Sequence, residues 1–324
     1  MKILITGGAG YVGGGVIDLL SGLGHELLVY DVLLYEESYR KNVPFVYGDI
    51  RDTAKLQPFL DWADVVIWLA ALVGDPACSL NEALTLAINQ DSVQYLRDHF
   101  KGRVIFMSTC SVYGAGEGIL AETSSLNPLS LYARTKLACE RILEGGNALI
   151  FRLGTLYGLS DEFSRVRFDL VLNTLVMRAI LHGKISVFGG NQFRPMLHVR
   201  DVARGVLAGL NSKACGIFNL SCENTTIADM AGLVKKHFQH IEVEYTDIRS
   251  QDQRNYRVSW DKAKGTIGFL PHLTMEEGIT ELKEVLLTGR IKNSFLKRYS
   301  NYLYLKPLVD EYRSPLGYLM ETGI

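Results

Sequence analysis

The sequence predicts an α/β protein with a doubly wound parallel sheet and a smaller mixed α/β lobe. Two observations lead to this fold class. Short apolar, β-branched runs alternate with helical patterns up to about residue 155, and a glycine-rich turn joins the first run to the first helix. After residue 155 the alternation becomes irregular and basic residues cluster. The chain has 324 residues, of which 48% are hydrophobic and 21% are charged, a composition typical of globular proteins. This length is sufficient for two domains.

We expect the first domain at residues 1–155, with residues 198–221 returning to it, and the second lobe at 156–197 and 222–299. The tail at 300–324 is rich in tyrosine and leucine, and Pro307 and Pro315 interrupt it. It is too short to span a membrane. The tail packs either on the body or on another subunit, and the sequence leaves both open.

Composition narrows the functional classes. The net charge of −1 gives no basic excess for non-specific nucleic-acid binding. Five scattered cysteines without C-x-x-C pairing predict reduced thiols and neither a disulfide framework nor a metal site. The chain begins on a strand-like run without signal-peptide features, and no apolar run is long enough to cross a bilayer. We therefore expect a cytoplasmic protein.

The glycine turn follows the first predicted strand, Lys2–Thr6, and opens a helix that runs to about Leu23. Strand, glycine turn and helix in this order are the context of a dinucleotide site. There, glycines let the backbone approach a pyrophosphate, and the helix N-terminus offers free N–H groups. The residues expected to contact the cofactor here are Gly7, Gly10, Tyr11, Val12 and Gly13.

Asp31 lies at the end of the second predicted strand, Glu26–Tyr30, and 18 positions after Gly13. A carboxylate at this place accepts hydrogen bonds from the adenosine ribose hydroxyls and repels a 2′-phosphate. The sequence therefore predicts NAD rather than NADP as the cofactor.

The third and fourth predicted strands are Phe45–Ile50 and Asp64–Ala71, and both end at the carboxyl edge of the sheet. Asp49 either bonds the adenine amino group or caps the following helix. The further residues expected to line the cofactor trench are Ile50, Leu69, Ala70 and Ala71. In the predicted helix at 81–100, Asn89 is placed to tie neighbouring strand ends together.

Hydroxyl and thiol side chains end the fifth predicted strand, Arg103–Met107, and Tyr132 and Lys136 follow on a helix. A spacing of four puts both side chains on one helical face. An ammonium near a phenol favours the phenolate and lowers the tyrosine pKa. Tyr132 is therefore a candidate acid/base for a hydroxyl proton.

These motifs together resemble the extended short-chain dehydrogenase/reductases, in particular the nucleotide-sugar epimerase/dehydratase branch. The resemblance implies a Rossmann domain with a substrate-binding lobe, and it extends to about residue 290. It rests on T-G-G-A-G-Y-V-G (Thr6–Gly13), G-D-I-R-D (Gly48–Asp52), L-A-A (Leu69–Ala71), S-T-C-S-V-Y-G (Ser108–Gly114), N-P-L-S-L-Y-A-R-T-K (Asn127–Lys136) and R-P-M-L-H-V-R-D-V-A (Arg194–Ala203).

The resemblance implies a role for each matching residue. Tyr132 is the acid/base, Lys136 bonds the nicotinamide ribose and lowers the tyrosine pKa, and Thr109 bonds the reacting sugar hydroxyl. Ser108 belongs to the NAD site. The family also implies a nucleotide-diphosphate sugar as substrate and a homodimer formed through the helices that carry Asn89 and Tyr132.

Cys110 and Ser111 stand where the sugar 4,6-dehydratases of this family carry an Asp-Glu pair. Because serine has no useful acidity and a thiol is only a modest acid, a standard 4,6-dehydratase is disfavoured. Cys110 is either a proton donor in a variant reaction or a small residue packed at a strand end.

On the substrate side the resemblance assigns Asn173, Arg194 and Arg254, with the two arginines clamping a diphosphate. Each arginine alone is equally compatible with a surface ion pair. Thr155 departs from the asparagine that the family often has. Further predicted elements are helices at 168–182, 226–237 and 275–287 and strands at 216–220 and 242–245.

The leading functional prediction is an NAD-dependent nucleotide-sugar epimerase that oxidises C4 transiently and returns the hydride. The first alternative is a C4 dehydrogenase that releases the ketosugar, as in bacterial surface-sugar pathways. A variant dehydratase or reductase comes next, and a non-catalytic NAD-binding protein comes last.

Overall fold

A seven-stranded parallel sheet forms the centre of the protein, seen in a computed structural model that describes residues 1–246 and 254–312. The strand order is β11-β7-β5-β4-β1-β2-β3, and all six pairings are parallel. The strands are β1 (Lys2–Thr6), β2 (Glu26–Asp31), β3 (Phe45–Tyr47), β4 (Val65–Trp68), β5 (Arg103–Thr109), β7 (Ala148–Leu153) and β11 (Gly216–Leu220). The order changes direction at β1, between β2 and β4, which confirms the predicted doubly wound sheet.

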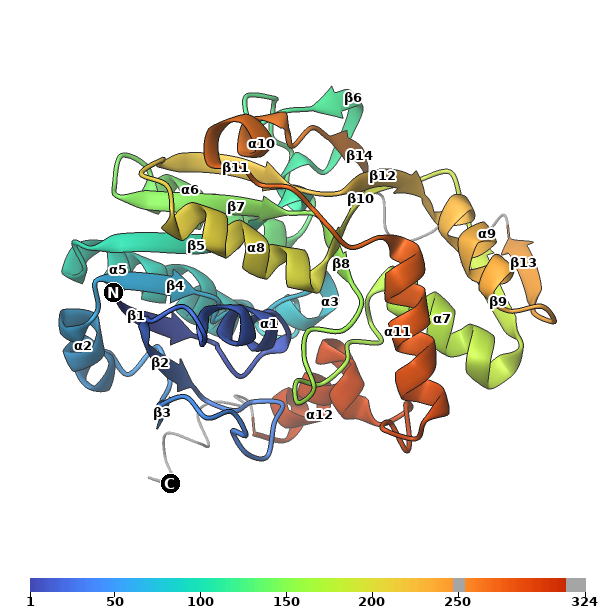
Figure 1. The fold of residues 1–324 in the computed structure, drawn as a ribbon, viewed down its shortest axis with the longest axis horizontal. Helices are drawn as coiled ribbons and strands as arrows, with labels where there is room; N and C mark the ends of the chain where they lie inside the picture. Colours follow the sequence, from blue (N-terminus) through green and yellow to red (C-terminus); the bar gives the residue numbers. More distant parts are fainter. Residues whose placement is uncertain (247–253, 313–324) are drawn as a thin grey trace.

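Helices cover both faces of this sheet (Figure 1). One face buries Leu56, Leu96 and Leu143, and the other buries Ile17 and Val206. The helices of the first face are α2 (Thr53–Trp62), α3 (Asp75–Cys78), α4 (Glu82–Leu86), α5 (Ser92–His99) and α6 (Leu131–Leu143), and those of the second are α1 (Tyr11–Leu20), α8 (Val199–Leu210) and α10 (Asp261–Ile267).

A second lobe with its own apolar core lies at the right of Figure 1. Its sheets are mixed, because β10 (Phe193–His198) pairs parallel with β8 (Thr155–Tyr157) and antiparallel with β12 (Glu223–Thr226). The predicted smaller mixed lobe is thus confirmed. Its other elements are α7 (Val171–His182), β9 (Lys184–Phe188), α9 (Ile227–His237), β13 (Glu242–Thr246) and α11 (Met275–Leu287), and a parallel pair of β6 (Ala115–Leu120) and β14 (Asn255–Val258) lies at the top of the figure.

The predicted helix at 81–100 is interrupted by a π-helical turn, η1 (Ala87–Asp91), between α4 and α5. Asn89 lies in this turn and is buried. Its Oδ1 accepts from the Leu72 N–H at 2.8 Å, and its Nδ2 donates to the Leu72 carbonyl at 2.9 Å. Asn89 therefore fixes the chain just after β4, the structural role that the sequence suggested.

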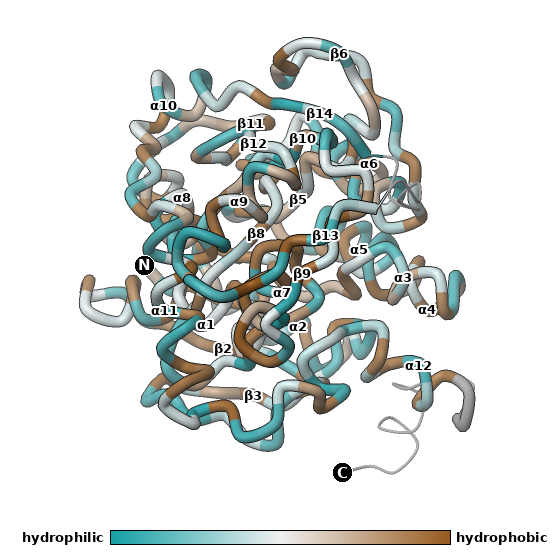
Figure 2. The backbone as a smooth tube through the Cα atoms, turned by 90° about the vertical axis from the view of Figure 1, so that its right-hand side faces the viewer, coloured by the Kyte–Doolittle hydropathy of each residue, from teal (hydrophilic) through white to brown (hydrophobic). Residues whose placement is uncertain are grey.

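The C-terminal segment packs on the body of the protein. A 3₁₀ turn, η3 (Lys297–Tyr299), leads into α12 (Asn301–Tyr312), which lies beside α3 (Figure 2). Leu305 is 1% exposed and belongs to the core of the first sheet face. The Tyr304 ring lies 5.1 Å from that of Tyr35. Of the two alternatives for the tail, packing on the body or on another subunit, this part of it packs on the body. Residues 313–324 lie outside the described residues.

Two expected absences concern the described part of the chain alone. Across residues 1–246 and 254–312, the structure has no helix with the length and apolar character that a membrane span requires. Over the same ranges, no cluster of histidine, cysteine, aspartate and glutamate is arranged to hold a metal ion. The five cysteines, all of which fall within these ranges, are free.

Candidate active site

A cavity of about 800 Å³ lies at the carboxyl ends of the central strands and extends to the second lobe. Sixteen of the predicted site residues line it, drawn from five helices and strands and from the connections between elements. They are Gly7, Gly10, Tyr11, Val12, Asp31, Asp49, Ile50, Leu69, Ala70, Ala71, Ser108, Thr109, Tyr132, Lys136, Arg194 and Arg254. Gly13, Cys110 and Asn173 do not line the cavity.

The glycine turn fits a dinucleotide pyrophosphate. Gly7 has φ of +71°, and an added Cβ would lie 2.6 Å from the Ala70 backbone nitrogen. At Gly13 an added Cβ would lie 2.3 Å from the Gly8 carbonyl oxygen, so this glycine allows α1 to pack rather than contacting a ligand. The cap residue of α1, Gly10, supplies no side-chain hydrogen bond. The first N–H groups of α1 are therefore available to an anion in the cavity.

Asp31 connects the glycine turn to the end of β2. Its Oδ2 accepts from the Ala9 N–H at 3.0 Å and its Oδ1 from the Leu33 N–H at 2.7 Å. Burial raises the pKa of Asp31 to about 6, although the backbone donors Leu33 and Ala9 oppose this effect. The carboxylate is thus oriented at the cavity edge, where it can accept hydrogen bonds from ribose hydroxyls.

Asp49 lines the cavity next to Ile50 but does not cap a helix. Its carboxylate pairs with the Arg51 guanidinium at 2.7 Å and accepts from the Arg51 N–H at 2.8 Å. The cap of α2 is Asp52, which accepts from the Lys55 N–H at 3.0 Å. The capping alternative for Asp49 is therefore wrong, and the adenine contact stays a prediction.

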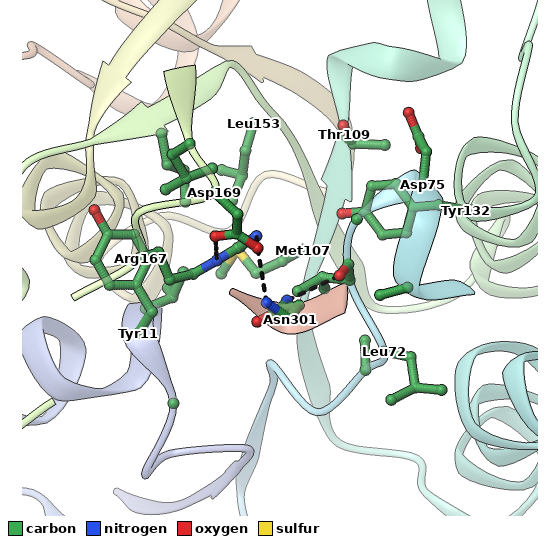
Figure 3. A pocket seen from close by; sticks show the side chains of 18 of the residues that line it. Tyr11, Leu72, Asp75, Met107, Thr109, Tyr132, Leu153, Arg167, Asp169 and Asn301 are labelled. Atoms are coloured by element: carbon green, nitrogen blue, oxygen red, sulfur yellow. Dashed lines mark hydrogen bonds and ion pairs between the residues drawn. The ribbon is translucent and has the colours of Figure 1, made fainter. Parts of the chain in front are cut away.

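Thr109, Tyr132 and Lys136 come together on one wall of the cavity. Thr109 ends β5, and its Oγ1 accepts from the Ser111 N–H at 3.1 Å. Tyr132 and Lys136 lie on α6, whose N-cap Ser130 accepts from the Ala133 N–H at 3.2 Å. Figure 3 shows Thr109 and Tyr132 side by side, opposite Tyr11 and Arg167. This arrangement places a phenol and an aliphatic hydroxyl on the same side of the cavity.

The prediction that Lys136 lowers the Tyr132 pKa is not met in the structure. Burial raises the pKa of Tyr132, Cys78 and Asp75 add to this shift, and the cations Arg167 and Arg254 oppose it. Burial also lowers the pKa of Lys136, whose Nζ lies 4.7 Å from the centre of the Phe106 ring. Desolvation is the largest cause of both pKa shifts, although Tyr132 is only partly buried at the cavity wall, whereas Lys136 is buried.

A buried ion pair behind this wall was not predicted. The Arg152 guanidinium donates to both carboxylate oxygens of Glu140, at 3.0 and 2.7 Å. Ser108 donates from its Oγ to the same carboxylate at 2.5 Å, so its hydroxyl proton is engaged by Glu140. One signal was available, since Glu140 lies one helical turn after Lys136 on the same face.

Cys110 points away from the cavity, and its assignment as a catalytic residue is corrected. The thiol is fully buried and donates to the Arg152 carbonyl at 3.2 Å, and burial raises its pKa. The packing alternative therefore applies. In the 3₁₀ turn that follows β5, η2 (Cys110–Tyr113), it is Ser111 that lines the cavity.

Asn173 is also placed differently from its predicted role in substrate binding. It is fully buried on α7, where its Oδ1 accepts from the Gly158 N–H at 3.0 Å and its Nδ2 donates to the Arg167 carbonyl at 2.9 Å. A weaker contact of 3.5 Å reaches the Tyr11 hydroxyl. Asn173 therefore holds the connection between β8 and α7 rather than facing the cavity.

Arg194 and Arg254 converge on the substrate side of the cavity. Arg194 donates to the carbonyls of Phe193, at 2.9 Å, and Arg254. Arg254 donates to Ser111 Oγ at 3.1 Å and pairs with Asp75 at 3.4 Å. Neither of them is a simple surface ion pair, because both line the cavity and Arg194 is buried.

The remaining wall combines residues 165–169 with the C-terminal segment, which sequence reasoning did not place here. Arg167 pairs with Asp169 at 2.9 Å, and Asp169 also accepts from the Asn301 N–H at 2.9 Å. Asn301 Nδ2 donates to the Val73 carbonyl at 2.9 Å, so Asn301 bridges the two lobes (Figure 3). The only available signal was the clustering of arginines at 165 and 167.

Comparison with known proteins agrees with this geometry. The model of the NAD dependent epimerase/dehydratase family matches residues 3–221. A UDP-glucose 4-epimerase of Corynebacterium glutamicum is 26% identical over 317 residues, 87% of this chain and 94% of that protein. A dTDP-glucose 4,6-dehydratase of an Actinoplanes strain is 28% identical over 318 residues, 87% of this chain and 96% of that protein.

Among solved structures, a UDP-glucose 4-epimerase of Thermotoga maritima with UDP-glucose superposes with a TM-score of 0.79 at 24% identity. It covers 90% of this chain and 100% of its own. The chain belongs to the NAD dependent epimerase/dehydratase family, whose members modify nucleotide sugars. NAD is the cofactor of this family, and the glycine turn and Asp31 fit it.

Proposed function

We propose that this protein is an NAD-dependent nucleotide-sugar epimerase that oxidises C4 of the sugar transiently. The observation that carries the proposal is the joint placement of Thr109, Tyr132 and Lys136 in the cavity that also holds the glycine turn and Asp31. When bound, NAD supplies the hydride acceptor, and the protein supplies geometry and proton transfer.

Tyr132 moves the proton and Thr109 orients the hydroxyl that loses it. Burial favours the protonated phenol, so Tyr132 is suited to return a proton when the ketone is reduced. In the oxidation direction the phenolate is needed. The charge of Arg254 and Arg167 favours that form, and Lys136 lies one helical turn away.

The proposed substrate is a sugar bound through a nucleoside diphosphate. Arg194 and Arg254 support this, because guanidinium groups make paired charge-assisted hydrogen bonds to phosphate oxygens. Arg254 contacts Ser111, which in turn contacts Tyr256, and all three residues line the cavity together with Arg194. The UDP-glucose in the Thermotoga maritima epimerase agrees with this class of ligand.

A 4,6-elimination is disfavoured, since it requires an acid and a base beyond the tyrosine. Positions 110 and 111 carry a buried thiol with a raised pKa and a serine hydroxyl. Neither provides a carboxylate for proton transfer at neutral pH. A C4 dehydrogenase that releases the ketosugar needs the same three residues, Thr109, Tyr132 and Lys136. Only the product therefore distinguishes such a dehydrogenase from an epimerase.

A panel of nucleotide sugars tests the proposal. The purified protein is incubated with UDP-, GDP-, CDP- and dTDP-sugars, NADH is followed by absorbance, and the sugar products are identified by NMR. We expect a C4 epimer without net NADH. Accumulating NADH with a ketosugar would identify the dehydrogenase instead, and no turnover of any sugar would favour a non-catalytic NAD-binding protein.

The homodimer and the cytoplasmic location that the sequence suggested stay predictions. Sedimentation of the purified protein tests the first: a dimer is expected, and a monomer would contradict it.

A further inference from the structure

Arg165 is a buried cation on the cavity wall that was assigned no function. Its side chain stacks on Tyr35, with the guanidinium carbon 3.9 Å from the ring centre. Nη1 donates to the Arg298 carbonyl at 2.9 Å and Nη2 donates to Asn301 Oδ1. These partners are neutral and engage only part of the five N–H donors of a guanidinium.

The charges around Arg165 do not balance. Arg167 is paired with Asp169 at 2.9 Å, and Arg298 is paired with Glu36 at 2.9 Å. Among the described residues, no carboxylate lies within the 4.0 Å ion-pair distance of the Arg165 guanidinium. Burial, with the neighbouring charge of Arg167, lowers the pKa of Arg165 to about 10, so the group stays charged at neutral pH. The carboxylates of Asp169 and Glu36 offset part of this charge, but they are also the ion-pair partners of Arg167 and Arg298, so three arginines share two carboxylates. A buried charge that is only partly compensated is costly, which indicates an anionic ligand.

The position of Arg165 identifies which anion it would meet. The preceding residue, Ser164, lies against the glycine turn, with its Oγ 3.5 Å from the Gly10 carbonyl oxygen. The Arg165 N–H donates to Glu36 at 2.9 Å, in the segment that follows Asp31. Arg165 therefore lies between the pyrophosphate-binding turn and the segment after the predicted ribose-binding carboxylate. Arg194 and Arg254, by contrast, lie near Ser111 and Tyr256.

We propose that Arg165 binds the diphosphate of the dinucleotide cofactor and that the C-terminal segment at 297–301 positions it for this task. The carbonyl of Arg298 and the amide of Asn301 hold the guanidinium group of Arg165, which lines the cavity. The proposal rests on the NAD site of the family and does not depend on which sugar is converted. It gives a role in cofactor binding to a segment that lies beyond the family match at 3–221.

Binding measurements on the full-length protein test this proposal, with the cofactor removed and no turnover required. The variants are Arg165→Gln, Arg165→Lys and Asn301→Ala. The matched control is Arg103→Gln, because Arg103 also donates to two carbonyls, of Gly209 and Ala214 at 3.1 and 2.8 Å, but does not line the cavity. The dissociation constants of NAD and of UDP are measured for each variant at two salt concentrations, and the melting temperature is measured without ligand.

For Arg165→Gln we expect the dissociation constant of NAD to rise about 10- to 100-fold, as for loss of a charge-assisted hydrogen bond, with UDP binding unchanged. Its NAD affinity should also depend less on salt. Asn301→Ala should weaken NAD binding by a smaller factor than Arg165→Gln. The NAD affinity of Arg165→Lys should lie between the affinities of these two variants. Arg103→Gln should leave NAD binding unchanged.

Three results would overturn the proposal. NAD affinity unchanged in Arg165→Gln would show that the charge does not contact the cofactor. Weaker UDP binding with unchanged NAD binding would assign Arg165 to the substrate diphosphate. Equal weakening of both ligands with an unchanged salt dependence would mark a purely structural residue. If Arg165→Gln does not fold, Asn301→Ala and Arg165→Lys decide among the same outcomes.

Discussion

The two walls of the cavity are built in different ways. The wall at the glycine turn comes from the ends of neighbouring strands of the central sheet: Gly7 approaches Ala70, and Asp31 accepts a hydrogen bond from the Ala9 N–H. Another wall joins segments outside this sheet, such as those of Arg165 and Asn301, which are 136 positions apart. The first wall lies within the family match at residues 3–221. The second wall adds a C-terminal segment that lies beyond this match.

The largest effect is expected at the chemical centre. Tyr132→Phe removes the proton donor and acceptor and should lower kcat by about 10³-fold, in the range of general acid–base catalysis. NAD binding should remain unchanged, since the aromatic ring is kept. Tyr256→Phe is the matched control, because Tyr256 also lines the cavity and contacts Ser111 at 3.4 Å.

Steady-state kinetics and NAD titration of both variants give the answer. We expect a large loss of kcat for Tyr132→Phe. For Tyr256→Phe the loss of kcat should be less than about tenfold, the size of one neutral hydrogen bond. Comparable losses of kcat in the two variants would contradict the role of Tyr132 as proton donor and acceptor.

The next effect tests whether the C-terminal segment is part of the folded body. Leu305→Ala should lower the free energy of unfolding by about 2–5 kcal/mol, because Leu305 is 1% exposed and its truncation leaves a cavity in the core. Leu303→Ala on the same helix is the control: Leu303 is 49% exposed, so its change should stay within about 0.5 kcal/mol. Urea unfolding measures both, and a stable Leu305→Ala variant would mean that α12 does not pack on the body.

A smaller, pH-dependent effect is expected at Asp31. The pKa of Asp31 is raised to about 6 by burial, so the carboxylate is ionised above that pH and protonated below it. The ionised carboxylate accepts hydrogen bonds from the ribose hydroxyls. NAD affinity should therefore be constant above pH 6 and fall by up to about tenfold per pH unit below pH 6. Titration of NAD between pH 5 and pH 8 measures this dependence.

Asp31→Asn provides the control for that measurement. The amide does not titrate, so its NAD affinity should be weaker than that of the wild type at pH 8 and nearly independent of pH. A wild-type profile that is flat down to pH 5 would show that the Asp31 charge does not contribute to cofactor binding.

The smallest effect is expected at Cys110. Cys110→Ala should change kcat by less than about threefold, because the thiol faces the Arg152 carbonyl rather than the cavity. Thr109→Val, one position earlier and on the cavity side, should lower kcat by about 10²-fold. Kinetics of this neighbouring pair would contradict the account if Cys110→Ala were the more damaged variant.

Local chemistry explains what was predictable from sequence. The parallel sheet, the glycine turn and Asp31 follow from short patterns whose meaning does not depend on distant residues. The direction of Cys110 was not predictable, because the chain changes there from β5 to a 3₁₀ turn, after which Ser111 lines the cavity and Cys110 does not. Asn173 stands at a family position, yet its amide is taken by Gly158 and Arg167.

Long-range contacts explain most of what was missed. The role of the C-terminal segment depends on Asn301 reaching Asp169 and the Val73 carbonyl, which no local pattern encodes. The direction of the Tyr132 pKa shift depends on the whole fold for a related reason, since burial raises this pKa by more than the charges of Arg167 and Arg254 lower it.

The central claim, transient oxidation at C4 with return of the same hydride, is tested most directly by isotope retention. A nucleotide sugar deuterated at C4 and accepted as a substrate is converted by the purified protein, and the C4 epimer is analysed by NMR and mass spectrometry. The deuterium is expected to stay at C4 of the product without NADH build-up. Loss of the label, or release of a ketosugar with stoichiometric NADH, would contradict this claim.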